Sequence, residues 1–480
     1  MENRRTEKTV FTILITFLLI GSLIYFQNGY FDLLQAKWNF FITVSVIIIF
    51  VHYMYKVHAW DKKCSDSKKL LWIYAFVLII ETIVSDFPVC AFWGTSDWRT
   101  GSFFMLMCIV ICTIIAEWDI DITEIIKKWF VANAGVLVLG LLNVLDFDPL
   151  GMISQLSEED YGLYISTVGN VNWYGAYLAI VFPLAVFLFV ESQTGYEFFL
   201  YGTVFLLALV NIVICNSDCA VIGFIVTVIA ALIFRKYYVN RGKYGLVLLL
   251  ISSIALVTLY ILDRKRVFVI EMGMLQRLMI SPIVILIACI VFIYLYVSAR
   301  EKTKKIYIIF LIFSFLLVTG IILRFGLLYA LVDTISYYLT FNENWGNGRG
   351  EIWAAAIRMF LKFNWKDRLL GTGCDTFSLL IQKYEIGILI DGERMLKNAH
   401  CEFLQLLITT GIIGVGLYYY IFGRTVKKCV KTEDGLQRAL SVALLSYLVQ
   451  QLVNNIQAVT TPVSFILLGF LLNSFEKEKK

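Results

Sequence analysis

The sequence predicts an all-α, polytopic membrane protein with about 12 to 14 transmembrane helices and one large external helical loop. Of its 480 residues, 59% are hydrophobic and only 16% are charged. A water-soluble chain of this composition could not cover its surface with polar groups. Long apolar runs recur along the chain and stop for one long polar stretch, residues 325–399.

The apolar runs are close to the roughly 17 to 25 residues that a helix needs to cross a bilayer, although several lie at the lower limit. The first run follows Arg4, Arg5 and Lys8 and lacks a small-residue cleavage site. It is therefore interpreted as a transmembrane helix and not as a signal peptide. The predicted spans are 10–26, 38–55, 70–84, 103–115, 131–145, 173–190, 198–214, 220–234, 244–262, 278–297, 306–323, 404–422, 440–456 and 463–475.

The distribution of Lys and Arg predicts the orientation of the spans. Connections on the predicted inner side are rich in basic residues, whereas 27–37 and 85–101 are poor in them. The positive-inside rule then places both termini in the cytoplasm and residues 325–399 outside it. The basic segments are 56–69, 235–243, 300–305, 424–438 and 477–480.

One segment departs from this rule. Arg264, Lys265, Arg266 and Arg277 fall on the predicted outer side. Either two spans are miscounted, or these cations face outward to meet an anionic ligand.

The span pattern divides the chain into three parts: an N-terminal bundle at 1–324, the large loop with amphipathic helices at 325–399, and C-terminal spans with a short basic tail at 400–480. The net charge of +5 is scattered through short loops, so no nucleic-acid partner is expected. The ten Cys residues show no metal-ligand spacing, and no metal or other cofactor is expected. No ATP-binding loop motif occurs, so a reaction outside the cytoplasm needs a substrate that arrives activated.

Arg349 is the first candidate functional residue. It follows a glycine-rich turn and opens an amphipathic helical pattern that is suited to the membrane surface. An arginine here is either a solvated helix end or a group that binds phosphate at a helix N-terminus. Its glycine neighbours favour the phosphate interpretation. Downstream, Gly371 and Gly373 predict a packing turn, with Asp375 or Thr376 as the cap of the next helix.

His400 is the second candidate, in the first turn of a span at the predicted outer interface. The helix dipole there disfavours a charged imidazole, so a neutral ring able to accept a proton is expected. We interpret it as a general base, with a structural hydrogen-bonding role as the alternative. The other two histidines, His52 and His58, belong to the predicted inner side. Glu402 is expected to cap the helix at the interface.

Other polar residues lie at predicted outer helix ends. Arg99 stands between Gly94 and Gly101, and Asn170 and Asn172 precede another span. Asn170 is also a good helix cap. Together, Arg, Asn and His at these ends are what a site for a pyrophosphate and hydroxyl groups would require.

Four stretches resemble the O-antigen ligase and polymerase superfamily of bacterial surface-glycan assembly. Two departures matter: Asp218 stands where the family often has Arg, and Cys401 stands where Asn usually follows the His. The matching stretches are TVGNVNWYGAYL at 167–178, GRGEIW at 348–353, LGTG at 370–373, and NAHCEFLQ at 398–405 followed by TGIIG at 410–414.

The resemblance implies a GT-C-like, metal-independent membrane glycosyltransferase in a bacterial cytoplasmic (inner) membrane. Its donor would be a polyprenyl-pyrophosphate-linked oligosaccharide and its acceptor a glycan or glycolipid. His400 would deprotonate the acceptor hydroxyl and Arg349 would neutralise the pyrophosphate. Arg99, Asn170, Asn172 and Asn398 would bind substrate.

The pathway's flippase and chain-length regulator are possible protein partners. Ligase and polymerase activity both stay open, and a residue bias typical of AT-rich genomes favours polymerase. The main alternative is a multi-pass transporter of a small or anionic solute, for which few intramembrane charges such as Glu81 are available. A non-catalytic scaffold in glycan export is a third interpretation.

Overall fold

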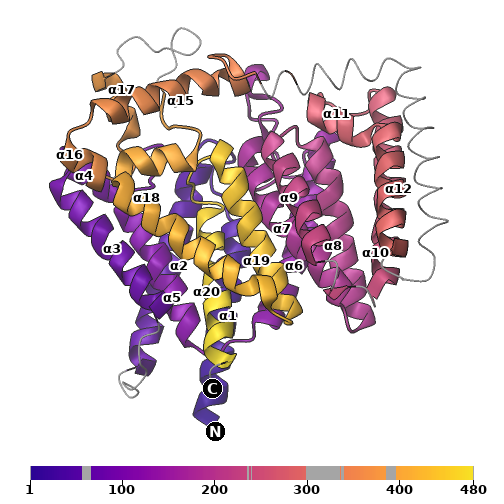
Figure 1. Ribbon diagram of the computed structural model, residues 1–480, viewed down its shortest axis with the longest axis horizontal. Helices are drawn as coiled ribbons and strands as arrows, with labels where there is room; N and C mark the ends of the chain where they lie inside the picture. Colours follow the sequence, from indigo (N-terminus) through magenta and orange to yellow (C-terminus); the bar gives the residue numbers. More distant parts are fainter. Residues whose placement is uncertain are drawn as a thin grey trace.

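The computed structural model describes residues 2–56, 66–234, 237–238, 241–298, 336, 340–384 and 396–478. The helices form a bundle with two distinct ends (Figure 1). One end carries α15 (Trp345–Lys362) and α17 (Phe377–Tyr384), and we call it the α15 end. Both termini lie at the opposite end, which we call the terminal end.

Helices account for nearly all of the regular structure in the described residues. One small antiparallel pair joins β1 (Tyr164–Ile165) to β2 (Gly169–Asn170). The remaining α-helices are α1 (Glu2–Ile24), α2 (Leu33–Lys56), α3 (Asp66–Val84), α4 (Pro88–Trp93), α5 (Ser102–Glu117), α6 (Ile122–Val144), α7 (Val171–Glu191), α8 (Gly195–Ile214), α9 (Asp218–Phe234), α10 (Gly242–Arg264), α11 (Met274–Ile280), α12 (Pro282–Ser298), α16 (Trp365–Leu370), α18 (Glu402–Lys428), α19 (Gly435–Gln450) and α20 (Thr461–Glu478). Short 3₁₀ turns are η1 (Glu158–Asp160), η4 (Cys429–Lys431) and η5 (Gln451–Val453).

The predicted all-α, polytopic membrane class is confirmed. Within the described part of the chain, seven helices are long and apolar enough to cross a membrane, or eight if α11 and α12, bent by 59°, form one span. Every predicted span except 306–323 coincides with a described helix, and 306–323 lies outside the described residues. The predicted span 440–456 ends earlier, at Gln450, and an irregular polar segment leads from there to α20.

The centre of the bundle is α7, which packs against α8, α9 and α19. Polar side chains join its neighbours inside the core. Tyr174 donates a hydrogen bond to Asn211 on α8 at 2.8 Å, and Asn211 donates to the Leu137 carbonyl on α6 at 2.9 Å. Such bonds satisfy groups that lipid could not, and they fix the register of the three helices.

A break in α18 fixes the glycine turn that precedes α17. Gly411 has φ 66° and ψ −174° inside this helix. The carbonyl oxygens just before the break, on Ile408 and Thr409, accept hydrogen bonds from the backbone N–H groups of Thr372 (3.3 Å) and Gly373 (2.9 Å). A Cβ on Gly411 would stand 2.4 Å from the Leu369 carbonyl oxygen. The predicted packing turn therefore docks into a gap that only glycine leaves open.

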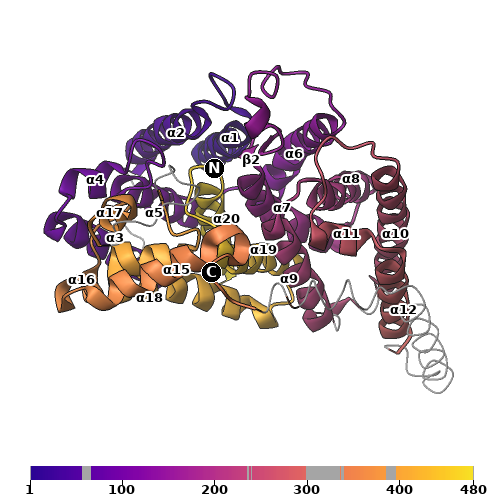
Figure 2. The ribbon, with the colours of Figure 1, turned by 90° about the horizontal axis from the view of Figure 1, so that it is seen from above.

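The described part of the large loop forms a second hydrophobic core over α18. Figure 2, seen from above, shows α15 lying across α18. The apolar face of α15 is therefore buried against the protein. The sequence predicts the same amphipathic pattern but assigns its apolar face to the membrane surface. The buried members of this core are Ile352, Ala355, Ala356, Met359, Phe363, Phe377, Leu380, Ile381, Leu396, Ala399 and Ile408.

Gly411→Ala should destabilise the protein by about 1–3 kcal/mol, because alanine disfavours this backbone conformation and its Cβ meets the 369–371 backbone. Gly416 on the same helix has nothing within 4 Å of its Cβ position. Gly416→Ala is therefore the matched control and should be neutral or stabilising by up to ~1 kcal/mol. Thermal unfolding in detergent compares the two variants, and equal midpoints would contradict the docking role of the break.

Candidate functional site

His400 sits on a strained backbone that three side chains hold in place. Its φ is 47°, an uncommon value for a residue with a Cβ. The buried Asn398 accepts a hydrogen bond from the His400 N–H through Oδ1 at 3.0 Å. Gln405 accepts from the Ala399 N–H at 2.9 Å, and Trp353 Nε1 donates to the Ala399 carbonyl at 3.1 Å. Asn398, predicted to bind substrate, thus has a positioning role in the structure.

Arg349 lies beside this segment. Although α15 begins at Trp345, Gly346 and Gly348 have φ values of 61° and 84°, so regular helical turns start at Arg349 as the sequence predicts. Trp353 is one turn further along, on the same face of the helix. The bond from Trp353 to the residue before His400 therefore brings the two predicted catalytic residues together.

The charge of Arg349 acts directly on His400. The pKa of the imidazole falls to about 4, chiefly through burial and then through the positive charge of Arg349. The predicted neutral ring follows from these two causes rather than from the helix dipole proposed at the sequence level. Arg349 also acts electrostatically on Cys401 and on Cys219, which follows Asp218 at the head of α9.

Asn455 completes the surroundings of His400, and the sequence analysis did not identify it. Its Nδ2 lies 3.3 Å from Nδ1 of the imidazole. It belongs to the irregular segment between η5 and α20, which was predicted to be part of a span. The available signal was the polar run Gln450-Gln-Leu-Val-Asn-Asn-Ile-Gln457, which is too polar for a lipid-facing helix.

Glu402 does not cap the helix at an interface, so that expectation is wrong. Its side chain is fully buried. One oxygen, Oε1, accepts hydrogen bonds from the hydroxyls of Tyr418 (3.1 Å) and Tyr447 (3.3 Å), and Gln451 Nε2 lies 3.5 Å away. The carboxyl group therefore points into the bundle, where α18 packs against α3 and α19.

Arg99 lies in a loop, residues 94–101, that Asp375 holds. The Asp375 oxygen Oδ2 accepts from the Thr95 N–H (2.7 Å), the Thr95 hydroxyl (3.0 Å) and the Thr100 N–H (3.2 Å). Of the two predicted caps, Asp375 or Thr376, the Asp375 carboxylate therefore holds this loop instead of the helix. Arg99 has φ 51°, and its guanidinium lies 5.6 Å from the centre of the Trp38 ring.

Two further contacts show that the 94–101 loop reaches the other site segments. Asp97 and Lys397 form an ion pair at 2.9 Å, which links the loop to the segment that carries His400. The rings of Trp98 and Trp173 meet at 6.0 Å, which links it to the head of α7. Within the described residues, Arg99 Nε is buried without a hydrogen-bond partner.

At the head of α7, Asn170 is the helix cap, as its alternative interpretation predicts. Its side chain accepts from the Asn172 N–H at 2.9 Å. Asn172 accepts from the Ser217 hydroxyl at 3.1 Å, and its backbone carbonyl accepts from Asn454 Nδ2 at 2.9 Å. Substrate binding by these asparagines stays a prediction. The structure links Asn172 to Asn454, which directly precedes Asn455, the residue in contact with His400.

The basic segment that departs from the positive-inside rule also lies at the α15 end. The Val269 N–H donates to the carbonyl of Val144, the last residue of α6, at 3.1 Å. Arg264, Lys265 and Arg266 are exposed there. They lie at the same end as α15, which is what the predicted order of the spans requires, and their outward orientation stays a prediction.

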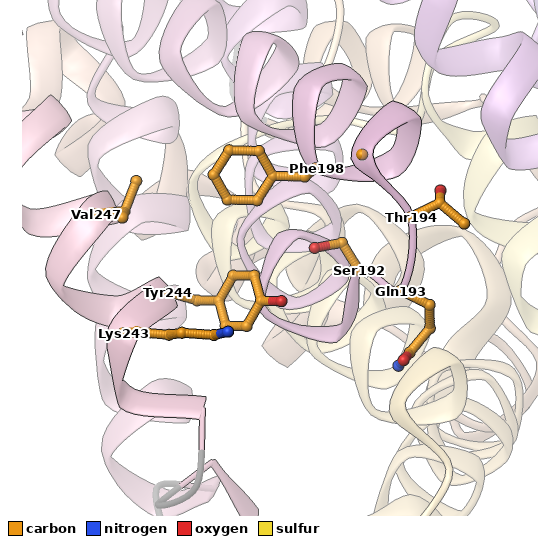
Figure 3. Close-up of a pocket in the computed structure, with 8 residues that line it drawn as sticks. Ser192, Gln193, Thr194, Phe198, Lys243, Tyr244 and Val247 are labelled. Carbon is orange, nitrogen blue, oxygen red and sulfur yellow. The ribbon is translucent and has the colours of Figure 1, made fainter.

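His52 and a surface hollow mark the terminal end. His52 accepts from Trp118 Nε1 at 2.6 Å, and His58 lies outside the described residues. The hollow is lined by residues of the α7–α8 connection and the start of α10, including Thr194, Phe198 and Tyr244 (Figure 3). It is the full length of α7 away from Asn172, so it takes no part in the site around His400.

Comparison with known proteins gives one family match. Residues 274–419 match the family model described as O-antigen ligase. This stretch contains Arg349, Asp375 and His400, whereas Arg99 and Asn455 lie outside it. No curated protein matches the chain.

The Asp375 contact predicts a pH-dependent stability. Burial raises the pKa of this carboxyl group from 3.8 to about 6. Between these values the folded protein holds a proton that the unfolded chain has lost, so this group's contribution to stability falls as pH rises from about 4 to 6. Asp375→Asn keeps an acceptor oxygen for all three donors and removes the titration. The variant should therefore gain stability relative to wild type above pH 6, by about 3 kcal/mol at most.

Thermal unfolding of both proteins at pH 4.5 and 7 measures this difference. Asp97→Asn is the control, because its ion pair with Lys397 is half-exposed and should contribute less than about 1 kcal/mol at either pH. The same midpoint difference between Asp375→Asn and wild type at both pH values would contradict the prediction.

Proposed function

Because residues 274–419 match the O-antigen ligase family, the chain is identified as a member of the O-antigen ligase and polymerase superfamily, and we propose that it transfers a polyprenyl-pyrophosphate-linked glycan to an acceptor hydroxyl. The reaction takes place on the outer face of a bacterial cytoplasmic membrane, with both termini in the cytoplasm. The observation that carries the proposal is the Trp353 hydrogen bond, which brings the helix of Arg349 to the segment of the partly buried His400.

His400 acts as the general base. As the acceptor oxygen attacks the anomeric carbon of the donor sugar, the imidazole takes the hydroxyl proton. A glycosidic C–O bond forms, and the C–O bond to the pyrophosphate breaks. The bonding pair leaves with the polyprenyl pyrophosphate. An imidazole that stays neutral across the physiological pH range is always ready for this step.

Arg349 neutralises the charge that develops on the leaving group. A guanidinium remains protonated at any physiological pH and presents paired donors to phosphate oxygens. Arg99 is the second candidate, because the Asp375-bound loop holds it at the same end of the bundle. Pyrophosphate is already a good leaving group, so positioning and charge neutralisation supply most of the catalysis. No nucleotide sugar or metal is required by this scheme.

The acceptor is either a second repeat unit on the carrier lipid, as in a polymerase, or a lipid-linked core sugar, as in a ligase. A flippase would deliver the donor to the outer face, and a chain-length regulator would act on the product. The alternative function, a transporter, is supported by the buried carboxyl groups of Glu81 and Glu402, because acidic residues inside a membrane often line a transport path.

We expect His400→Ala and Arg349→Ala each to abolish polymer formation while the protein remains in the membrane. The first variant removes the general base and the second removes the cation that neutralises the leaving group. Loss of a general base alone lowers the rate by roughly 10²- to 10⁴-fold. Gel banding of surface polysaccharide in a complemented deletion strain measures the effect. Arg358→Ala is the matched control, because Arg358 is exposed and projects from the opposite face of α15.

A normal ladder in both site variants would reject the catalytic assignment. Altered uptake of a small solute with unchanged glycan would favour the transporter, and a normal yield and chain length in His400→Ala alone would favour a scaffold.

The pH dependence of kcat/KM provides a separate check. Since the pKa of His400 is lowered to about 4, the base is deprotonated above that pH and becomes protonated below it. The acidic limb of kcat/KM, which reports the free enzyme, should lie near pH 4. Initial rates with purified protein and a lipid-pyrophosphate donor give this limb, and a limb near 6.5 would mean that His400 is solvated in the free enzyme.

A further inference from the structure

We propose that Asn455 is the positioning residue of His400: its side-chain amide holds the imidazole through Nδ1 and leaves Nε2 as the nitrogen that takes the acceptor proton. The part played by Nε2 rests on the function proposed above. The part played by Nδ1 rests on geometry alone and has its own test.

The contact between the two side chains is direct. Asn455 is 3% exposed, and its amide lies 3.3 Å from Nδ1 of His400. Its Oδ1 is buried and has no hydrogen-bond partner among the described residues. A half-turn of the amide exchanges nitrogen and oxygen with little change of shape. After that turn Oδ1 accepts from Nδ1–H, and Nδ2 takes the position that Oδ1 leaves.

The reaction requires this second orientation. An imidazole that uses Nε2 as a base carries its hydrogen on Nδ1, and after proton transfer both ring nitrogens carry hydrogen. The Nδ1–H group then needs an acceptor, which the amide oxygen provides. An apolar side chain in place of Asn455 would leave Nδ1–H unpaired at the moment when the ring becomes charged.

The backbone of Asn455 is fixed from two sides. Its carbonyl accepts from Gln451 Nε2 at 3.1 Å, and its N–H donates to Asn454 Oδ1 at 2.9 Å. Asn454 in turn donates to the Asn172 carbonyl at the head of α7. Gln451 also donates to the Tyr447 hydroxyl at 2.8 Å. A side chain held in this way restricts the orientation of the ring that it contacts.

The neutrality of Asn455 suits the charges around His400. Arg349 on α15 is the charged group that acts on the ring, and the thiol of Cys401 is the adjacent titratable group on its own segment. Glu402 points away into the bundle, towards Tyr418 and Tyr447. An aspartate at position 455 would stabilise the imidazolium and attract Arg349 away from the pyrophosphate. An amide orients the ring without either effect.

The ring contact can be tested without substrate. The chain contains only three histidines, so ¹⁵N-histidine labelling gives three imidazoles, and His400→Ala identifies the signals of His400. Asn455→Leu should change the ¹⁵N shifts that report the His400 tautomer. Asn455→Asp should raise the pH at which these signals titrate by at least about one unit. Unchanged His400 signals in both variants would overturn the inference.

Kinetics with a purified polyprenyl-pyrophosphate-linked oligosaccharide test the catalytic half. Asn455→Leu should lower kcat by roughly 10- to 100-fold, part of what a general base supplies, with KM changed by less than about twofold. Asn455→Asp should move the acidic limb of kcat/KM to higher pH. Asn473→Leu is the control: this buried asparagine donates to the Ile115 and Trp118 carbonyls near the terminal end. Its loss should reduce stability and leave the pH profile unchanged.

The outcomes separate the two proposals. If His400→Ala is inactive and Asn455→Leu retains wild-type kcat and pH profile, the positioning role fails and the proposed function stands. If His400→Ala is fully active, the base assignment fails, and the tautomer measurement alone decides whether Asn455 orients the ring. Equal, purely proportional losses of folded protein and activity in Asn455→Leu and Asn473→Leu would also reject the positioning role.

Discussion

The hydrogen bond from Trp353 to the Ala399 carbonyl is the interaction on which the rest of the site depends. A residue with a positive φ, such as His400, keeps that conformation only when its surroundings over-determine it. Asn398 and Gln405 fix the backbone from within the same segment, whereas Trp353 fixes it from α15. Since Arg349 lies one turn from Trp353, this bond brings the helix that carries the guanidinium to the segment that carries the imidazole. The second hydrophobic core packs α15 against α18.

A second chain of hydrogen bonds connects the α18 break to the loop that carries Arg99. Gly411 frees two carbonyl groups, and the glycine turn at 371–373 docks on them. The turn then presents Asp375 to the backbone of the 94–101 loop. A helix from the end of the chain thus positions a cation near its beginning through two successive hydrogen-bonded contacts. Because each contact uses backbone groups, the arrangement depends on local geometry more than on the identity of surface side chains.

Local features of the chain could be predicted from the sequence, and long-range pairings could not. Span positions follow from apolar length, and Arg349 and His400 were identified because a glycine turn and a helix start are visible within a few residues. Asp375 and Asn455 act on partners 275 to 280 and 55 residues away, respectively. No local pattern in the sequence around Asp375 or Asn455 indicates these partners. Glu402 was misjudged for the same reason, since its burial is decided by Tyr418 and Tyr447 across the bundle.

Charge balance explains why a neutral base and a cationic anion-binding group can share one site. The Asp375 carboxylate is hydrogen-bonded to the 94–101 loop through Oδ2, and Glu402 is hydrogen-bonded inside the bundle. Both acids are hydrogen-bonded to other groups, and the charge of Arg349 adds to burial in keeping His400 unprotonated. A bound pyrophosphate would cancel much of that charge and raise the proton affinity of the imidazole. The base would then be strongest when the donor is in place, which couples proton removal from the acceptor to the presence of a leaving group.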